Sequence, residues 1–290
     1  MAADDRPVTA NYVLPEKDVT GPFLRKLPTK MEQMKDIPKL GFTSAREGLA
    51  GKFHMSQQLL STLNPGQRFA HAGDTIVVLD TSSGQPVPPV KADRVEVDKN
   101  QQTVKLFDKP NSLIGFYTAP VGSEEKPSPS GTLKVTEIDH NPIFRYNPEY
   151  PFKGVYSRKP FTIKPGPNNP VGTVWINLSA DGYGIHGTPA PDKLSKAASH
   201  GCVRLTNWDA ERVADSVVKG APSRLRRHAA PKAGQASREL RRASCSRGGV
   251  KNPLSHQAIS HEYAFTLRGI WQKRSEARRT SRELPFPRAW

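Results

Sequence analysis

Two short segments of the sequence contain the residue types that thiolate chemistry needs. One reads Ser199-His200-Gly201-Cys202, and the other, further upstream, contains His186. A thiol attacks a carbonyl carbon well only as the thiolate. At neutral pH an ordinary thiol is only slightly ionised, so a neighbouring imidazole must take the proton. His186 and His200 are therefore the two candidate bases.

The spacing around Cys202 indicates what its neighbours can contribute. His200 and Arg204 each lie two positions from Cys202, so in an extended segment the three side chains point to the same side. Gly201 allows the backbone to approach a reacting carbonyl closely, and the N–H groups of Gly201 and Cys202 can then stabilise an oxyanion. Arg204 can bind a substrate carboxylate through two parallel hydrogen bonds. His186 must be brought to the site by the fold.

The same residues allow two other interpretations. Cysteine is among the most buried residue types, so a core Cys202 with two surface histidines nearby is one alternative. A zinc site made of His186, His200 and Cys202 is the other. It lacks the paired spacing that usually marks such sites, and no fourth ligand is evident. We therefore predict thiolate chemistry with no metal or other cofactor.

The two segments resemble the signature of the L,D-transpeptidase catalytic domain family of the YkuD type. The resemblance rests on Ile185-His186-Gly187 and on the run SHGCVRL at residues 199–205. It extends to residues 128–135, SPSGTLKV, which are similar to the family's Thr-Pro-x-Gly-x-Phe-x-Ile stretch. Members of this family cross-link peptidoglycan through a cysteine acyl-enzyme, and the resemblance implies the same activity here.

The resemblance also implies a role for each residue. Cys202 is expected to be the nucleophile and His186 the proton donor and acceptor, with its ring oriented by the main-chain carbonyl of Gly187. The residues expected to bind the substrate and the oxyanion lie around the cysteine: Ser199, His200, Gly201 and Arg204. A thiolate mechanism of this kind requires no metal.

The expected partners are peptidoglycan stem peptides and glycan. The cysteine would attack the L-to-D peptide bond of a donor stem peptide, and an acceptor amine would complete a 3-3 cross-link. Water as acceptor would make the protein an L,D-carboxypeptidase, and a non-catalytic peptidoglycan-binding envelope protein is the alternative in a different class. The sequence leaves these outcomes, and the oligomeric state, open.

The resemblance implies a location in the periplasm or cell envelope. Residues 1–6, MAADDR, contain neither the basic n-region nor the apolar h-region of an export signal. We expect that the true start lies upstream or that the signal has been removed. No stretch approaches eighteen apolar residues, so we expect no membrane span.

Composition and length favour a mainly β protein with few helices. The chain has 290 residues, enough for one large or two small domains, and its 27 prolines argue against long helices. Its 2 cysteines do not make a disulfide framework. We divide the chain into an extended arm (1–40), a small LysM-like module (41–80), a linker (81–91), a β-sandwich-like catalytic domain (92–222) and a basic tail (223–290).

The small module is predicted from its pattern of leucines. Two short helices are expected between residues 43 and 66, with Ser56 as an N-cap, followed by a strand at 74–79. This order resembles a LysM-like peptidoglycan-binding module, although the usual leading strand is not evident before the first helix. A packing subdomain without glycan contact is the alternative.

Alternating residues predict the strands of the catalytic domain. We expect a hairpin at 94–107, a strand at 113–121, and a strand at 174–178 that leads into His186. A helix over 208–219 is expected, with Asn207 as its N-cap.

The long segment 139–170 is predicted to form an irregular lid over the site. Its aromatic residues would offer exposed surface to the substrate. These residues are Tyr146, Tyr150, Phe152 and Tyr156.

The positive charge of the chain is concentrated at its C-terminal end. The whole sequence has a formal net charge of +16, but residues 223–290 hold 13 arginines and 3 lysines against 4 glutamates. The tail shows no strand pattern, and we expect it to be disordered and to come from another reading frame or a fusion. The alternative, a nucleic-acid-binding arm, is less favoured, so no nucleic-acid partner is expected. We also expect the family's closing strand to be missing, which would leave one sheet edge unpaired.

Overall fold

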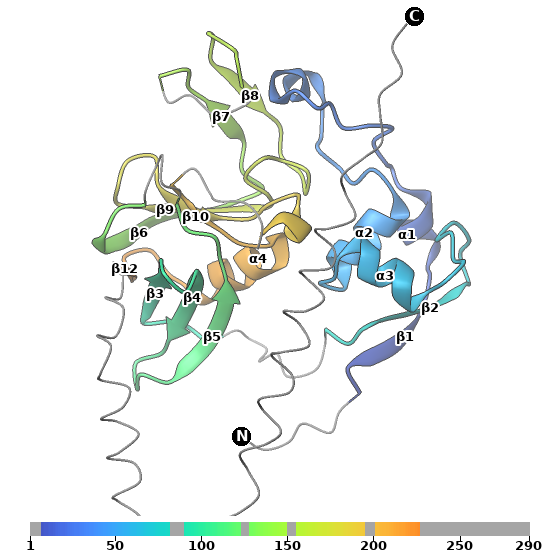
Figure 1. Cartoon of the computed structure of the whole chain (residues 1–290), viewed down its shortest axis with the longest axis horizontal. Helices are drawn as coiled ribbons and strands as arrows, with labels where there is room; N and C mark the ends of the chain where they lie inside the picture. The colour runs from blue at the N-terminus through green and yellow to red at the C-terminus, as the bar shows by residue number, and fades with distance from the viewer. Residues whose placement is uncertain (1–6, 82–89, 123–127, 150–154, 195–200, 227–290) are drawn as a thin grey trace, which may run out of the picture. The chain divides into compact units, whose positions relative to one another are not determined.

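The computed structural model describes residues 7–81, 90–122, 128–149, 155–194 and 201–226 (Figure 1). Most of the predicted linker and tail therefore lies outside the described residues, as does Cys245. None of the described helices combines the length and the apolar character that crossing a bilayer requires.

Strands predominate over helices in the described part, as predicted for a mainly β protein. The helical elements are α1 (Glu16–Thr20), the 3-10 helix η1 (Met31–Asp36), α2 (Ala45–Lys52), α3 (Gln57–Leu63), the 3-10 helix η2 (Pro191–Lys193) and α4 (Asn207–Ser216). The strands are β1 (Thr9–Val13), β2 (Thr75–Leu79), β3 (Arg94–Asp98), β4 (Thr103–Phe107), β5 (Leu113–Thr118), β6 (Gly131–His140), β7 (Phe144–Tyr146), β8 (Phe161–Ile163), β9 (Val174–Leu178), β10 (Gly184–His186), β11 (Val203–Arg204) and β12 (Pro222–Arg226).

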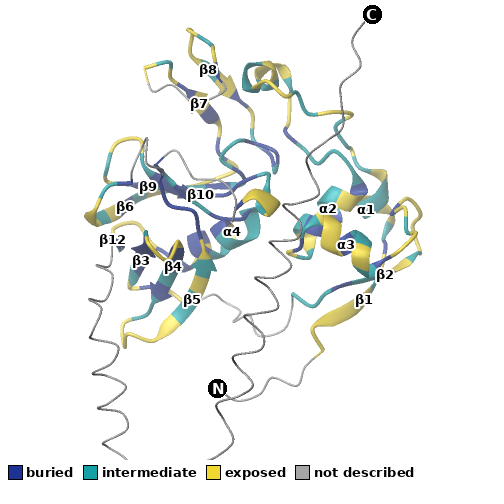
Figure 2. Cartoon of the chain, viewed as in Figure 1, coloured by how far each residue is buried: buried dark blue, intermediate teal, exposed yellow. Residues whose placement is uncertain are grey.

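Eight strands form one curled sheet in the order β11-β10-β9-β6-β12-β3-β4-β5. Its core contains valine, leucine and isoleucine from most of these strands, together with one face of α4. Figure 2 shows the buried segments of β3, β4, β9 and β10 in dark blue. The predicted hairpin is present as β3 and β4, and the strand before His186 is present as β9.

The expectation that no closing strand follows the helix is wrong. β12 lies between β3, to which it is parallel, and β6, to which it is antiparallel. Ser223 and Leu225 are buried while the two arginines between and after them face outward, so the segment alternates as a strand does. The prediction missed this short alternation because the outward positions are arginines in a segment that reads as part of the basic tail. The sheet is paired at this point, and its last strand extends past the boundary predicted at residue 222.

The helix after Cys202 is present, but its N-cap is Thr206 rather than Asn207. The Thr206 hydroxyl accepts a hydrogen bond from the backbone N–H of Asp209 at 3.1 Å. Asn207 instead uses its side chain to hold the loop before β9, because its Nδ2 donates to the carbonyl of Pro167 at 3.0 Å. The predicted apolar face is buried: Ala210, Val213, Ala214 and Val217.

The N-terminal segment is more ordered than an extended arm. β1 pairs antiparallel with β2, from Thr9 opposite Leu79 to Val13 opposite Thr75. α2 and α3 are the two predicted helices, and the Ser56 hydroxyl caps α3 by accepting from the backbone N–H of Leu59 at 3.0 Å. Buried residues of β2, α2 and α3 share one small core. The strand that pairs with β2 thus comes from residues far upstream of the two helices.

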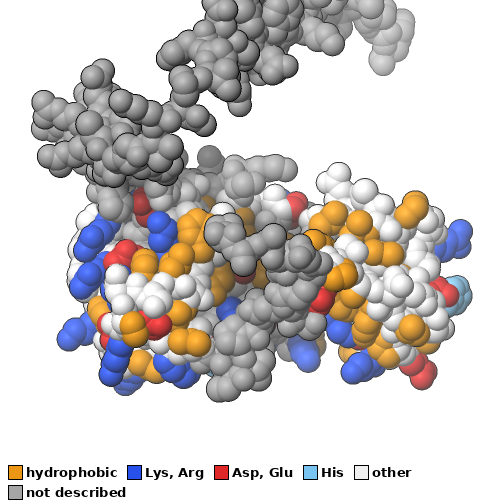
Figure 3. All heavy atoms as spheres, turned by 90° about the horizontal axis from the view of Figure 1, so that it is seen from below, with side chains coloured by type: hydrophobic (Ala, Val, Ile, Leu, Met, Phe, Trp, Pro, Cys, Tyr) orange, Lys and Arg blue, Asp and Glu red, His pale blue; other side chains and the backbone are white. Residues whose placement is uncertain are grey.

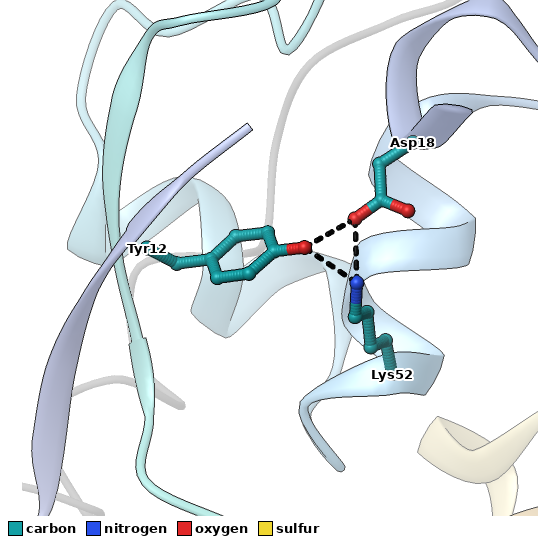
Figure 4. Close-up of polar contacts among 3 residues, drawn as sticks. All are labelled: Tyr12, Asp18 and Lys52. Carbon is teal, nitrogen blue, oxygen red and sulfur yellow. Dashed lines mark hydrogen bonds and ion pairs between the residues drawn. The ribbon is translucent and has the colours of Figure 1, made fainter. Parts of the chain in front are cut away.

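A polar cluster of Tyr12, Asp18 and Lys52 ties β1, α1 and α2 together (Figure 4). The Lys52 ammonium lies 2.7 Å from Asp18 Oδ2, and the Tyr12 hydroxyl donates to the same oxygen at 2.8 Å. Hydrogen bonds from Lys52 and Tyr12 outweigh the effect of burial and hold the pKa of Asp18 below its usual value. The ammonium also lies 4.6 Å from the centre of the Tyr12 ring, a cation–π contact.

The segment predicted to be an irregular lid contains a second small sheet. β7 and β8 pair antiparallel, with Arg145 opposite Thr162. Tyr146 is buried and packs with Leu40 and Ile163 in a separate cluster, so it does not offer exposed aromatic surface. Tyr156 is exposed, whereas Tyr150 and Phe152 lie outside the described residues. The prediction that this segment is irregular is therefore wrong for the described residues, while its role as a lid stays a prediction.

The charged side chains of the described part do not gather into one basic surface on the face drawn in Figure 3. There, lysine and arginine side chains are scattered among acidic, apolar and uncharged ones. This distribution agrees with the sequence, in which the excess of positive charge belongs to residues 223–290.

The position of β12 leads to a first prediction. Replacing the buried Leu225 by alanine should lower the free energy of unfolding by about 2–5 kcal/mol, because it leaves a cavity in the middle of the sheet. Urea denaturation of the full chain measures the change. The exposed Arg226→Ala is the matched control and should change stability by less than about 0.5 kcal/mol. Equal stability of Leu225→Ala and the parent chain would contradict the placement of β12.

Candidate active site

The candidate site lies where β9, β10 and β11 run side by side. β10 is parallel to β11, with Ile185 opposite Val203 and His186 opposite Arg204. Ile185 and Val203 are buried in the main core. Because successive side chains of a strand point to opposite faces, His186 and Arg204 lie together on the other face of the sheet. Figure 1 shows β9 and β10 next to each other in this sheet.

His186 is held by three features of its surroundings. It is 6% exposed, its Nδ1 lies 2.6 Å from the carbonyl oxygen of Gly187, and its ring stacks on Trp175 with 5.4 Å between ring centres. A carbonyl can only accept, so Nδ1 carries the proton and Nε2 keeps a lone pair. The resemblance implies this contact with Gly187; its role in catalysis remains a prediction.

Burial keeps the His186 ring neutral. The pKa of His186 is lowered to about 4, chiefly by burial and in smaller part by the positive charge of Arg204, while hydrogen bonds with the backbone of Gly187 and Val171 act in the opposite direction. At neutral pH the ring is therefore a proton acceptor.

Gly187 cannot carry a side chain in this arrangement. A Cβ placed on it would lie 2.3 Å from Oδ1 of Asn207. That amide packs against the loop that follows His186 and accepts from the backbone N–H of Thr173 at 3.3 Å. The Ile-His-Gly run therefore combines an imidazole, a carbonyl within hydrogen-bond distance of its Nδ1, and a residue small enough for the helix start to pack behind it.

Cys202 precedes β11 and is partly exposed. Val203 and Leu205 are buried in the core, so Cys202 and Arg204 are on the opposite face, the one that carries His186. The Cys202 thiol donates to the carbonyl of Gly182, with 3.7 Å between sulfur and oxygen. This carbonyl belongs to the turn before β10, so the sulfur lies near the start of the strand whose last residue is His186.

Arg204 lies close enough to Cys202 to interact with its charge. Burial lowers the pKa of Arg204, and attraction to the Cys202 thiolate raises it. The guanidinium therefore provides a positive charge on the face where the thiolate would form. The sequence predicts that Arg204 binds a substrate carboxylate. The position of the guanidinium also suits it to stabilise a negative charge on the Cys202 sulfur.

Gly201 is buried and has φ 102°, a conformation that favours glycine. Its carbonyl accepts a hydrogen bond from the hydroxyl of Ser128. Ser199 and His200, which the sequence also assigned to the site, lie outside the described residues.

Sequence reasoning missed two contacts of the site. The stacking of Trp175 on His186 follows from their pairing across β9 and β10 and was not evident from the sequence alone. Ser128 was noticed only as part of a matching stretch, and nothing in its local sequence showed that it would reach Gly201.

The described residues contain no group of three or more His, Cys, Asp or Glu side chains that could hold a metal ion. His200, one of the three ligands of the zinc alternative, lies outside them. Within this limit, the described part of the site consists of a thiol, an imidazole and a guanidinium.

A cleft of about 680 Å³ lies elsewhere in the described part of the chain. Residues of α2 and α3 line it together with Thr188 and Trp208, and neither Cys202 nor His186 does. The ring of His54 stacks on Trp208 at its wall, with 5.3 Å between ring centres. The candidate active site is thus distinct from this cleft.

The sequence is similar to one protein family and to several known proteins. Residues 92–225 match the family model described as the L,D-transpeptidase catalytic domain. Two relatives are each named "Putative L,D-transpeptidase YkuD". The one from Bacillus licheniformis is 27% identical over 176 residues, which are 60% of this chain and 88% of the relative. The one from Bacillus subtilis is 28% identical over 173 residues, or 59% and 87%.

Among solved structures, an L,D-transpeptidase from Mycobacterium smegmatis is 18% identical, with a TM-score of 0.37. The match covers 46% of this chain and 57% of that one.

The buried ring of His186 should make the stability of the protein depend on pH. The unfolded chain takes up a proton on this residue near pH 6.5, whereas the folded chain resists until about pH 4. The contribution is therefore complete above about pH 6.5 and is lost as the pH falls towards 4, by about 3 kcal/mol in total.

Urea denaturation at several pH values measures this effect. His186→Gln, which does not titrate, should remove most of this part of the pH dependence, while the exposed His140→Gln should leave it intact. Parallel pH curves for the parent chain and His186→Gln would show that the ring is not shielded from protonation.

Proposed function

We propose that the chain is a peptidoglycan L,D-transpeptidase acting through a Cys202 acyl-enzyme, on the premise that residues 92–225 match the family model of the L,D-transpeptidase catalytic domain. The observation that carries the proposal is the parallel pairing of β10 with β11. It puts His186 and Arg204 on one sheet face, the face that the alternation of β11 also gives to the side chain of Cys202. An enzyme of this class needs a thiol, a base and a means of stabilising negative charge.

The proposed reaction begins with loss of the thiol proton. His186 is neutral, so the proton moves from Cys202 to the lone pair of Nε2 as the sulfur attacks the carbonyl carbon of the L-to-D peptide bond. The C–S bond forms, and the C=O π pair moves to the oxygen. Backbone N–H groups at Gly201 and Cys202 stabilise that oxyanion. The imidazolium then gives its proton to the departing amine of the D-residue as the C–N bond breaks.

The second half of the proposed reaction transfers the acyl group. An acceptor amine attacks the thioester carbonyl, the C–S bond breaks, and the thiolate is regenerated. Transfer to an amine of another stem peptide gives a 3-3 cross-link, and transfer to water gives a carboxypeptidase product. Ser199 and His200 are proposed to position the substrate, as in the family that the sequence resembles.

The N-terminal module supports a second, compatible role. β1, α2, α3 and β2 form a small unit with its own core. Apart from α1 and η1, which lie between β1 and α2, their order is the strand–helix–helix–strand order of a LysM-like module. We propose that this unit binds peptidoglycan glycan and holds the enzyme on its polymeric substrate. The corresponding location is the cell envelope or periplasm.

Covalent labelling tests the enzymatic proposal. A carbapenem should add its mass to the intact protein stoichiometrically, with no addition to Cys202→Ala and at least about a 100-fold slower addition to His186→Ala, because a base and its nucleophile act as a unit. Whole-protein mass spectrometry follows both. Labelling of Cys202→Ala at the parent rate would rule out Cys202 as the nucleophile.

Sedimentation with purified sacculi tests the binding role. The parent chain and Cys202→Ala should both pellet with sacculi, because binding through the module does not need the thiol. Leu60→Ala, which opens a cavity in the module core, should weaken pelleting, with Leu225→Ala in the catalytic sheet as the comparison. If neither variant pellets less than the parent, the module is not the binding element.

A further inference from the structure

The peptide group that joins Gly201 to Cys202 is held by a residue from a distant part of the chain. The hydroxyl of Ser128 donates to the carbonyl oxygen of Gly201, and Ser128 is only 6% exposed. Buried hydroxyls are almost always hydrogen-bonded. The Ser128 hydroxyl therefore has a defined partner, the peptide directly before the proposed nucleophile, and its O–H points in a defined direction.

Ser128 is itself fixed to the centre of the sheet. The ammonium of Lys99 donates to the carbonyl of Ser128 at 2.6 Å and to the hydroxyl of Ser130 at 2.8 Å. The backbone N–H of Lys99 donates to the carbonyl of Arg226, the last residue of β12, at 2.9 Å. The Ser128 hydroxyl is thus anchored through Lys99 to the end of β12.

β11 is also held by backbone contacts that do not involve Ser128. The backbone N–H of Arg204 donates to the carbonyl of Pro120 at 3.2 Å, and Val121 forms a bridge with Val203. The backbone N–H of Leu205 donates to the carbonyl of His186 at 2.8 Å. Ser128 therefore adds a restraint just before β11, at the peptide between Gly201 and Cys202.

The direction of this restraint has a chemical consequence. A trans peptide is planar, with its C=O and N–H pointing in opposite directions. When Ser128 binds the carbonyl of Gly201, the N–H of Cys202 must point away from Ser128. A carbonyl that accepts a hydrogen bond also polarises its amide, which makes the N–H a stronger donor.

We propose that Ser128 is a positioning residue for the oxyanion, and that its hydroxyl orients and polarises the peptide whose N–H, on Cys202, receives the negative charge. The proposal rests on the proposed acyl-transfer function. As the sulfur bonds to the carbonyl carbon, the π pair moves to the oxygen, and this N–H donates to it. Ser128 acts through the Gly201–Cys202 peptide and needs no contact with the substrate.

Two reactions of the same sulfur separate this role from a merely structural one. Acylation by a carbapenem passes through an oxyanion, whereas alkylation by iodoacetamide substitutes at a saturated carbon and forms none. Ser128→Ala should therefore lower the maximal acylation rate by about 10-fold to 100-fold while the alkylation rate stays within about twofold. The carbapenem concentration at half-maximal rate should change little.

Matched variants of the full chain complete the experiment. Ser128→Thr keeps a hydroxyl on Cβ and should acylate at close to the parent rate. Ser130→Ala removes an exposed hydroxyl that contacts Lys99 rather than Gly201, and it should leave both reactions unchanged. Whole-protein mass spectrometry follows the two adducts.

Three outcomes would overturn the inference. Acylation of Ser128→Ala at the parent rate would show that the hydroxyl does not matter. An equal fall in acylation and alkylation would show that Ser128 only supports the local structure. A parent chain that iodoacetamide alkylates but no carbapenem acylates would overturn the proposed function, and the inference with it.

Discussion

The short parallel pairing of β10 with β11 is the constraint on which the site depends. It consists of two residue pairs, Ile185 with Val203 and His186 with Arg204. Because matched residues of adjacent strands share a face, burying the two aliphatic side chains in the core sends the imidazole and the guanidinium to the opposite face. A shift of one residue in either strand would turn one of those two side chains into the core.

Burial sets the chemical state of the imidazole in this arrangement. Excluding water favours the neutral form, and Arg204 adds to the effect, so the positive charge of the site resides on the guanidinium. A neutral ring accepts a proton, but a base whose pKa is far below neutrality holds it weakly. In the proposed reaction, such a base suits transfer of the thiol proton during attack better than a resting ion pair, and the guanidinium would balance the negative charge of the sulfur.

Long-range pairing recurs throughout the described part of the chain. β1 completes a sheet with β2, β12 enters the middle of the main sheet, and η1 contacts the β7–β8 pair. Each of these elements lies far in sequence from its partner. The domain boundaries predicted from the sequence followed its proline-rich and basic segments. The packed units have other boundaries, because their strands come from distant parts of the chain.

The candidate residues of the site and the type of fold could be predicted from the sequence, because residue type and local spacing are enough for both. A cysteine with a histidine and an arginine two positions to either side, and alternating apolar residues in β3, β4 and β9, are local patterns.

Only the tertiary structure decided the rest. The register that brings His186 beside β11, the burial that keeps its ring neutral, and the reach of Ser128 to Gly201 depend on contacts between residues far apart in the chain. Local propensity does not encode such contacts, and β12 shows this directly: its five residues become a strand because β3 and β6 leave a place between them.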